Sequence, residues 1–173
     1  MSAKAQQQKP LVLGIGNAVM GDDGVGLRVV EELENEDVSD IAHTECVGVD
    51  GFRVLARLRN YEQAILVDAI SGLETGEVYV LTPDKLREEN LGHSLHDLSV
   101  EHVLRMGNTI YEDEFPSDIY FVGIGISSAS FGEEISEDVS NAVQTAVDVI
   151  VDILVSNGLD AETYDTTISN GGE

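Results

Sequence analysis

Three acidic side chains stand at places where an α/β fold gathers its ligands. Asp22 and Asp23 lie in a Gly- and Asp-rich stretch, residues 16–24, between an apolar run and a helical pattern. Asp68 closes a second apolar run, residues 63–68. Parallel strands present their carboxyl ends to ligands at one edge of the sheet, and crowded carboxylates repel one another unless a cation lies between them. An acid of the first pair together with Asp68 is therefore a candidate cation site.

Both positions also have a structural interpretation. An Asp just before Gly24 would accept hydrogen bonds from the first N–H groups of a helix, a capping interaction worth about 1 kcal/mol. Such a cap accounts for one of the two neighbouring acids, Asp22 or Asp23, but not for both. Asp68 could likewise cap the loop that follows its strand. Spacing alone leaves these alternatives open.

A histidine is the next candidate ligand. His96 lies in the segment 90–97, just before a predicted helix. Carboxylate and imidazole ligands suit several divalent metals, so ligand type does not select one. His93 stands three residues earlier, but a metal pair without a third neighbouring ligand is a weak signal. We expect His93 and His102 to be ordinary surface residues.

The loop after the first strand does not fit a nucleotide phosphate. Its Gly14-Ile-Gly16 start invites comparison with the dinucleotide fingerprint, which needs a third glycine where this chain has Val19. The helix N-terminus that would hold a pyrophosphate is already flanked by Asp22 and Asp23. No Gly-Lys-Ser/Thr sequence is present. The sequence predicts no nucleotide cofactor.

Hydrophobic periodicity predicts alternating strands and helices. We expect strands at 11–15, 41–47, 63–68, 76–82 and 118–124, and helices at 25–33, 51–58, 98–106 and 136–155. This alternation predicts an α/β three-layer sandwich, with a twisted, mostly parallel five-stranded sheet and helices on both faces. The link between the third and fourth strands is too short for a crossover helix, which indicates one antiparallel pair and a mixed sheet.

The chain length and polarity predict one domain with two loose ends. Residues 10–157 form the predicted α/β domain, residues 1–9 a flexible N-terminal segment, and residues 158–173 a polar, disordered tail. The start of the chain lacks the apolar stretch of a secretory signal, and no apolar run is long enough to span a membrane. We therefore expect a cytoplasmic protein.

The net charge of −24 comes from 33 acidic and nine basic residues. Such acidity disfavours binding to nucleic acid and to anionic membranes. It fits a salt-rich cytoplasm, attraction of a basic partner, or solubility, and the even spread of charge favours solubility. The single cysteine, Cys46, cannot form an internal disulfide and is predicted to be a small hydrophobe in a strand.

The segment Leu13-Gly-Ile-Gly-Asn-Ala-Val-Met-Gly-Asp-Asp-Gly-Val-Gly26 resembles the opening signature of the hydrogenase maturation endopeptidases. Three further segments agree in order along the chain: 65–70, 94–98, and 122–139. The resemblance covers residues 10–155. Two loops depart from it, because Gly48-Val-Asp-Gly51 replaces a Gly-Gly-Thr-like turn and the segment 126–130 replaces a Pro-Glu pair. We expect these departures to concern partner specificity. Asp50 could add a carboxylate near the site or shape a turn, and we favour the turn.

The resemblance implies an endopeptidase that removes the C-terminal extension of the nickel-loaded precursor of a [NiFe] hydrogenase large subunit. It implies that Asp23, Asp68 and His96 contact the nickel and carry the reaction, with the nickel contributed by the substrate. In a second mechanism the same trio holds a resident metal that activates water. The alternative function is a noncatalytic nickel- and precursor-binding checkpoint protein. Cys46 and the serines near Ser127 are weak candidates for an attacking group.

Overall fold

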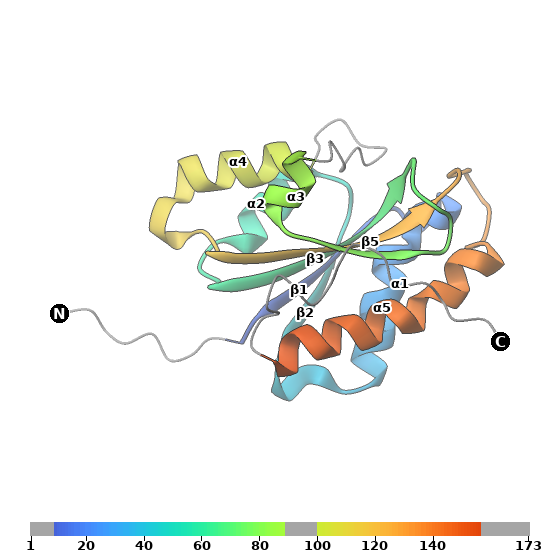
Figure 1. The fold of residues 1–173 in the computed structure, drawn as a ribbon, viewed down its shortest axis with the longest axis horizontal. Coiled ribbons are helices and arrows are strands. Elements are labelled where there is room, and N and C mark those ends of the chain that lie inside the picture. Colours follow the sequence, from blue (N-terminus) through green and yellow to red (C-terminus); the bar gives the residue numbers. More distant parts are fainter. Residues whose placement is uncertain (1–8, 89–99, 157–173) are drawn as a thin grey trace.

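A five-stranded sheet lies between two layers of helices in the computed structural model, which describes residues 9–88 and 100–156. Figure 1 shows α2, α3 and α4 on one side of the sheet and α1 and α5 on the other. The strands are β1 (Leu11–Ile15), β2 (His43–Val47), β3 (Gln63–Ser71), β4 (Val78–Leu81) and β5 (Asp118–Ile126). The helices are α1 (Val25–Asn35), α2 (Gly51–Leu58), α3 (Pro83–Glu88), α4 (Val100–Tyr111) and α5 (Glu137–Val155).

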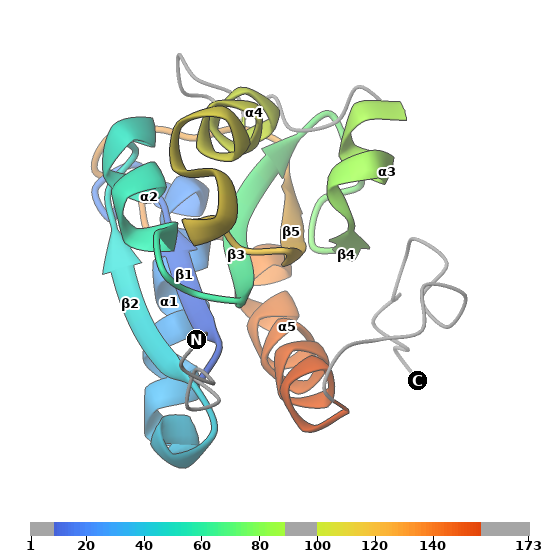
Figure 2. The ribbon, with the colours of Figure 1, turned by 90° about the vertical axis from the view of Figure 1, so that its left-hand side faces the viewer.

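The strand order in the sheet is β2-β1-β3-β5-β4. β4 pairs antiparallel with β5, and the other neighbouring pairs are parallel. Figure 2, which looks across the layers, shows the two groups of helices on opposite faces of this twisted sheet. The predicted three-layer mixed α/β sandwich is confirmed.

Alternation along the strands divides the apolar core between the two faces. In β3, Ile65 and Val67 pack toward α1 and α5, whereas Leu66 and Ile70 pack toward α2 and α4. The apolar side chains of α1 that face the sheet are fully buried: Val25, Val29, Val30 and Leu33. Burial of both faces is the reason why the central strands are continuously apolar instead of alternating.

Gly26 allows α1 to lie very close to the junction of β1 and β3. A Cβ atom at this position would collide with the backbone carbonyl oxygens of Ile15 and Val67. Because both obstacles are backbone atoms of central strands, a side chain cannot be accommodated by a change of rotamer.

Gly26→Ala is expected to destabilise the fold by about 3 kcal/mol, the upper part of the range for overpacked cores. The measurement is the free energy of unfolding in urea. Gly48→Ala is the matched control, because a Cβ at Gly48 meets nothing within 4 Å. Equal stability of the two variants would contradict this account of the contact between α1 and the sheet.

The predicted antiparallel pairing of the third and fourth strands is wrong, because β5 lies between β3 and β4. The connection from β3 crosses β5 at Gly125, where a Cβ would collide with the carbonyl oxygen of Glu74. Two backbone hydrogen bonds fasten this crossing, from the Gly76 N–H to the Gly125 carbonyl and from the Gly125 N–H to the Glu77 carbonyl, both 2.9 Å. The pairing of β4 with β5 therefore requires a residue without a side chain at position 125.

Most predicted elements are present with shifted ends. β2 begins at His43, not residue 41, because Val38–Asp40 form a 3-10 turn before it. Pro83, expected only to close β4, begins α3, since proline suits the first position of a helix. α4 extends to Tyr111, and its predicted first residues, 98 and 99, lie outside the described residues, as do 1–8 and the predicted tail. None of the described helices is both long and apolar enough to span a membrane.

Candidate functional site

The candidate site lies where the chain order reverses in the sheet. β2 flanks β1 on one side and β3 flanks it on the other, so the connections that leave β1 and β3 diverge at their carboxyl ends. Such a switch point is where open α/β sheets bind ligands. The pairing of β1 with β3 ends at Gly14 and Val67, which makes Asp68 the first β3 residue beyond it.

The sequence predicted that the strand ends at Asp68, but it does not. β3 continues to Ser71 because it stays paired with β5 along its whole length. Ala69 and Ile70 are also buried, 3% and 1% exposed, so the apolar strand resumes after the acid. Asp68 is therefore a charged residue inside a core strand and does not cap the following loop.

Asp68 is 1% exposed and, by alternation along β3, shares the face of Leu66 and Ile70, which α2 and α4 cover. Its Oδ1 accepts a hydrogen bond from the Ala69 N–H at 2.8 Å. Its Oδ2 is buried and has no hydrogen-bond partner among the residues that the structure describes. Burial raises the pKa of Asp68 well above its usual range, the Ala69 N–H opposes this shift, and the charge of Asp23 adds to it. A partly unsatisfied buried carboxylate is costly unless a ligand completes it.

Asp23 approaches Asp68 from a 3-10 turn, Gly21–Gly24, that contacts β3. Asp23 is 2% exposed. Its backbone is held at both ends, because its N–H donates to the Met20 carbonyl and its carbonyl accepts from the Asn17 N–H, each at 3.3 Å. The structure thus brings two of the acids singled out in the sequence, 45 residues apart, close enough for their charges to interact.

Asp22 has a different role from the helix cap considered in the sequence. The residue at the cap position of α1 is Gly24, so neither acid occupies that position. The Asp22 carboxylate instead binds the start of α5, accepting from the Ser136 N–H at 2.7 Å and from the Ser136 hydroxyl at 3.0 Å. The sequence predicted that α5 begins at Ser136, but no local pattern pairs residues 114 positions apart.

His96, the third predicted ligand, lies outside the described residues. Within 9–88 and 100–156, no three His, Cys, Asp or Glu side chains gather as a metal site would require. α4 begins four residues after His96 and packs on the same sheet face as Asp68. His102 is exposed on α4, as expected for a surface residue, and His93 lies in the part that the structure does not describe.

The Asp50 side chain shapes a turn, as predicted. It stands at the cap position of α2, and its Oδ1 accepts a hydrogen bond from the Phe52 N–H at 3.0 Å. This bond accounts for the acid in the loop after β2.

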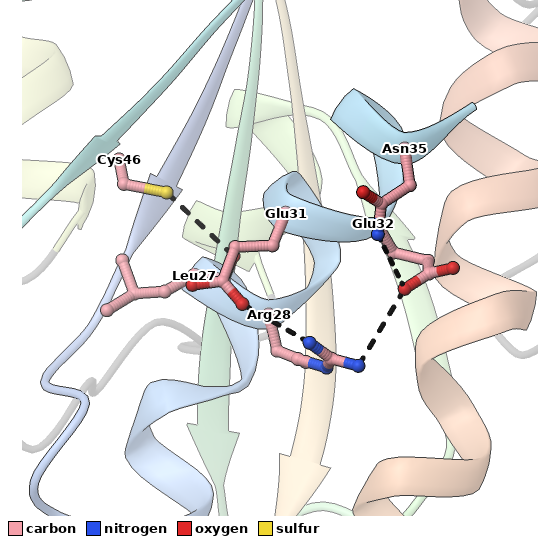
Figure 3. Close-up of polar contacts among 6 residues, drawn as sticks. All are labelled: Leu27, Arg28, Glu31, Glu32, Asn35 and Cys46. Carbon is pink, nitrogen blue, oxygen red and sulfur yellow. Dashed lines mark hydrogen bonds and ion pairs between the residues drawn. The ribbon is translucent and has the colours of Figure 1, made fainter. Parts of the chain in front are cut away.

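Cys46 lies in β2, as predicted, but on the exposed edge strand, where it does not act as a core hydrophobe. It aligns with Gly14 of β1 and faces α1, where its Sγ is 3.8 Å from the Leu27 carbonyl oxygen (Figure 3). Asp68 faces the opposite side of the sheet. Partial burial, together with neighbouring glutamates, raises the pKa of the Cys46 thiol to about 11. A thiol that stays protonated at neutral pH is a poor nucleophile.

Cys46→Ser is therefore expected to leave peptidase activity unchanged. The measurement is the rate at which the variant trims its precursor protein, compared with wild type at equal concentration of folded enzyme. A strong loss of activity in a variant that unfolds at the wild-type urea concentration would show that the thiol takes part in the reaction.

The fold and the two buried carboxylates define an α/β sandwich protein with an acidic site at the switch point of its sheet. A family model of hydrogenase maturation proteases (HycI) matches residues 27–153. The chain belongs to this family of peptidases, which confirms the resemblance and the predicted enzyme class.

Two relatives illustrate the similarity of sequence. The hydrogenase 2 maturation protease of Escherichia coli is 27% identical over 119 residues, which are 66% of this chain and 71% of the relative. Protein FrxA of Pyrococcus furiosus is 30% identical over 121 residues, 68% of this chain and 84% of the relative.

Two solved structures illustrate the similarity of fold. The hydrogenase maturating endopeptidase HybD from E. coli aligns with a TM-score of 0.72 and 25% identity, over 87% of this chain and 94% of that one. The [NiFe] hydrogenase maturation protease HybD from Thermococcus kodakarensis aligns with a TM-score of 0.66 and 26% identity, over 85% and 99%.

Proposed function

We propose that this protein is an endopeptidase that removes the C-terminal extension from the nickel-loaded precursor of a [NiFe] hydrogenase large subunit. Membership of the maturation protease family supports the processing role. The observation that supports recognition of nickel is the buried Asp68 Oδ2, which has no partner among the described residues and stands within reach of the Asp23 charge. A cation that arrives with the substrate would satisfy the Asp68 Oδ2 and offset the negative charge of Asp23.

In this proposal Asp23, Asp68 and His96 contact nickel that is already seated in the precursor. The nickel is then part of the substrate, so docking depends on its presence. Without a cation the two carboxylates repel each other and the precursor gains no favourable interaction at the site. This dependence explains why trimming would wait until nickel is inserted.

Exposed apolar side chains at the edge of the sheet formed by the carboxyl ends of β1, β2 and β5 are the proposed contacts to the rest of the precursor. The loops that follow β1, β2 and β5 carry Val19 (53% exposed), Val49 (38%) and Phe131 (80%), and the first turn of α2 carries Phe52 (62%). The loops after β2 and β5 are also the two that depart from the family resemblance. We propose that they select which precursor is processed.

Calorimetric titration with Ni²⁺ in high KCl, followed by mass spectrometry of the precursor, tests the proposal. High salt screens nonspecific binding of divalent ions to a chain of net charge −24. The expected result is loss of the C-terminal extension from nickel-loaded precursor and no change in nickel-free precursor. Binding of nickel-loaded precursor without cleavage would instead support the checkpoint function, and equal trimming of both precursors would contradict recognition of nickel.

A further inference from the structure

We infer that Asp22 is a positioning residue, which ties the turn that carries Asp23 to the start of α5 and so fixes Asp23 beside Asp68. The expected consequence for nickel binding rests on the proposed function. Its structural part stands on contacts within the described chain.

Both oxygens of the Asp22 carboxylate are engaged by one residue. Oδ1 accepts from the Ser136 N–H and Oδ2 from the Ser136 hydroxyl, at 2.7 and 3.0 Å, in a side chain that is 7% exposed. The positive end of α5, a helix of 19 residues, stabilises the negative charge. Hydrogen bonds to an ionised group in such a setting are stronger than neutral ones.

The use of Ser136 is unusual for a residue at the start of a helix. Serine at this position commonly accepts a hydrogen bond from its own helix. Here its side chain makes no such cap bond and its hydroxyl donates to Asp22 instead. The helix start therefore serves as an anchor for a turn 114 residues earlier in the chain.

A second contact joins the same two loops. The Gly132 N–H donates to the Val19 carbonyl at 2.8 Å. Gly21, in the left-handed region with φ +58°, lies against the loop after β5, so that a Cβ there would stand 3.5 Å from the Ser130 carbonyl oxygen. Figure 1 shows this loop passing beside the turn on its way to α5. The loops after β1 and β5 are thus fastened at two points.

The two neighbouring acids therefore have different roles. Asp22 binds α5, which packs against α1 and β5 in the core, and Asp23 interacts with Asp68 in β3. Loss of the Asp22 contacts would leave the hydrogen bond from Gly132 to Val19 as the remaining one between the two loops among those described above, while the strands and α5 keep their core packing. Partners that orient a metal ligand typically change metal affinity by about 10- to 100-fold when they are removed.

The test compares Asp22→Ala, Asp22→Asn and Asp50→Ala. Asparagine keeps an acceptor for the Ser136 N–H and can donate its amide to the hydroxyl, so it should restore the contact. Asp50→Ala removes a helix-capping carboxylate of equal charge from α2. Readouts are Ni²⁺ affinity by calorimetry, trimming of nickel-loaded precursor, hydrogen exchange of the turn amides, and the urea midpoint.

Asp22→Ala is expected to lose about tenfold or more in Ni²⁺ affinity and trimming rate per folded protein, with faster exchange of the Asp23 amide and a lower urea midpoint, because the Ser136 N–H and hydroxyl lose their acceptor. Asp22→Asn and Asp50→Ala should bind Ni²⁺ like wild type. The inference would be overturned if the turn amides of Asp22→Ala exchanged at the wild-type rate. It would also be overturned if this variant bound Ni²⁺ and trimmed the precursor like wild type. Failure of the proposed function gives a different result, because wild type itself would then leave nickel-loaded precursor intact while turn exchange still reports on Asp22.

Discussion

Replacing Asp68 with asparagine is expected to abolish trimming of nickel-loaded precursor and, at the same time, to stabilise the folded protein. The carboxyl group is buried, and one of its oxygens has no hydrogen-bond partner among the described residues. Asparagine has nearly the same shape and no charge to desolvate. It also removes the repulsion between this position and Asp23, which contributes to the raised pKa of Asp68. The group that costs stability is the one proposed to contact the cation.

The gain should be about 1 kcal/mol at neutral pH, the size of a modest unsatisfied polar group, or a rise in Tm of about 2–4 °C. Its pH dependence has a definite sign. Because burial raises the folded-state pKa of Asp68, wild type loses stability as pH rises above about 4, where the unfolded chain releases this proton first. The advantage of Asp68→Asn should therefore grow with pH until the folded-state carboxyl group has also ionised.

Urea denaturation of wild type and variant between pH 4 and pH 8 measures this difference. Asp40→Asn, which neutralises an exposed acid, is the matched control for removing one charge from a chain of net charge −24. The variant should exceed Asp40→Asn in stability at pH 7 and fail in the trimming assay. If Asp68→Asn were less stable than wild type, the carboxylate would be satisfied in the free protein. If Asp68→Asn still trimmed the precursor, Asp68 would not belong to the site.

Local sequence patterns were sufficient to predict the layers of this fold and to single out one member of the proposed site. Continuous apolar runs predicted the central strands, and the acid that closes one of these runs drew attention to Asp68, because α/β sheets bind their ligands at the carboxyl ends of parallel strands. The same pattern misplaced the end of β3, since an apolar run interrupted by Asp68 does not show that Ala69 and Ile70 continue the pairing with β5.

Long-range contacts account for what the sequence could not supply. The place of β4 depends on a crossing at Gly125 that only the folded chain brings together. Asp22 and Asp23 are adjacent residues of the same type, and their different roles arise because Asp22 binds Ser136 and Asp23 interacts with Asp68. Family resemblance selected Asp23 from this pair, whereas the structure supplies a physical reason for the presence of Asp22.

Asp23→Asn and His96→Ala are each expected to reduce nickel-dependent trimming strongly, and the residual rate of the double variant should equal that of the more impaired single variant. Groups that act as one unit are strongly non-additive, because removal of any member disables the rest. Asp23→Asn should also bring the pKa of Asp68 back toward its usual range, since the Asp23 charge contributes to raising it. The proposed trio thus predicts coupled, not independent, effects.

The assay follows cleavage of nickel-loaded precursor by each variant, with His93→Ala and His102→Ala as histidine controls. Both controls should trim like wild type, because neither residue belongs to the proposed trio. If His93→Ala lost activity and His96→Ala kept it, the imidazole of the trio would belong to His93 and the assignment to His96 would be wrong. Precursor binding by the inactive variants separates two roles for the trio: variants that no longer bind the precursor have lost recognition of nickel, whereas variants that bind it without cleavage have lost a catalytic group.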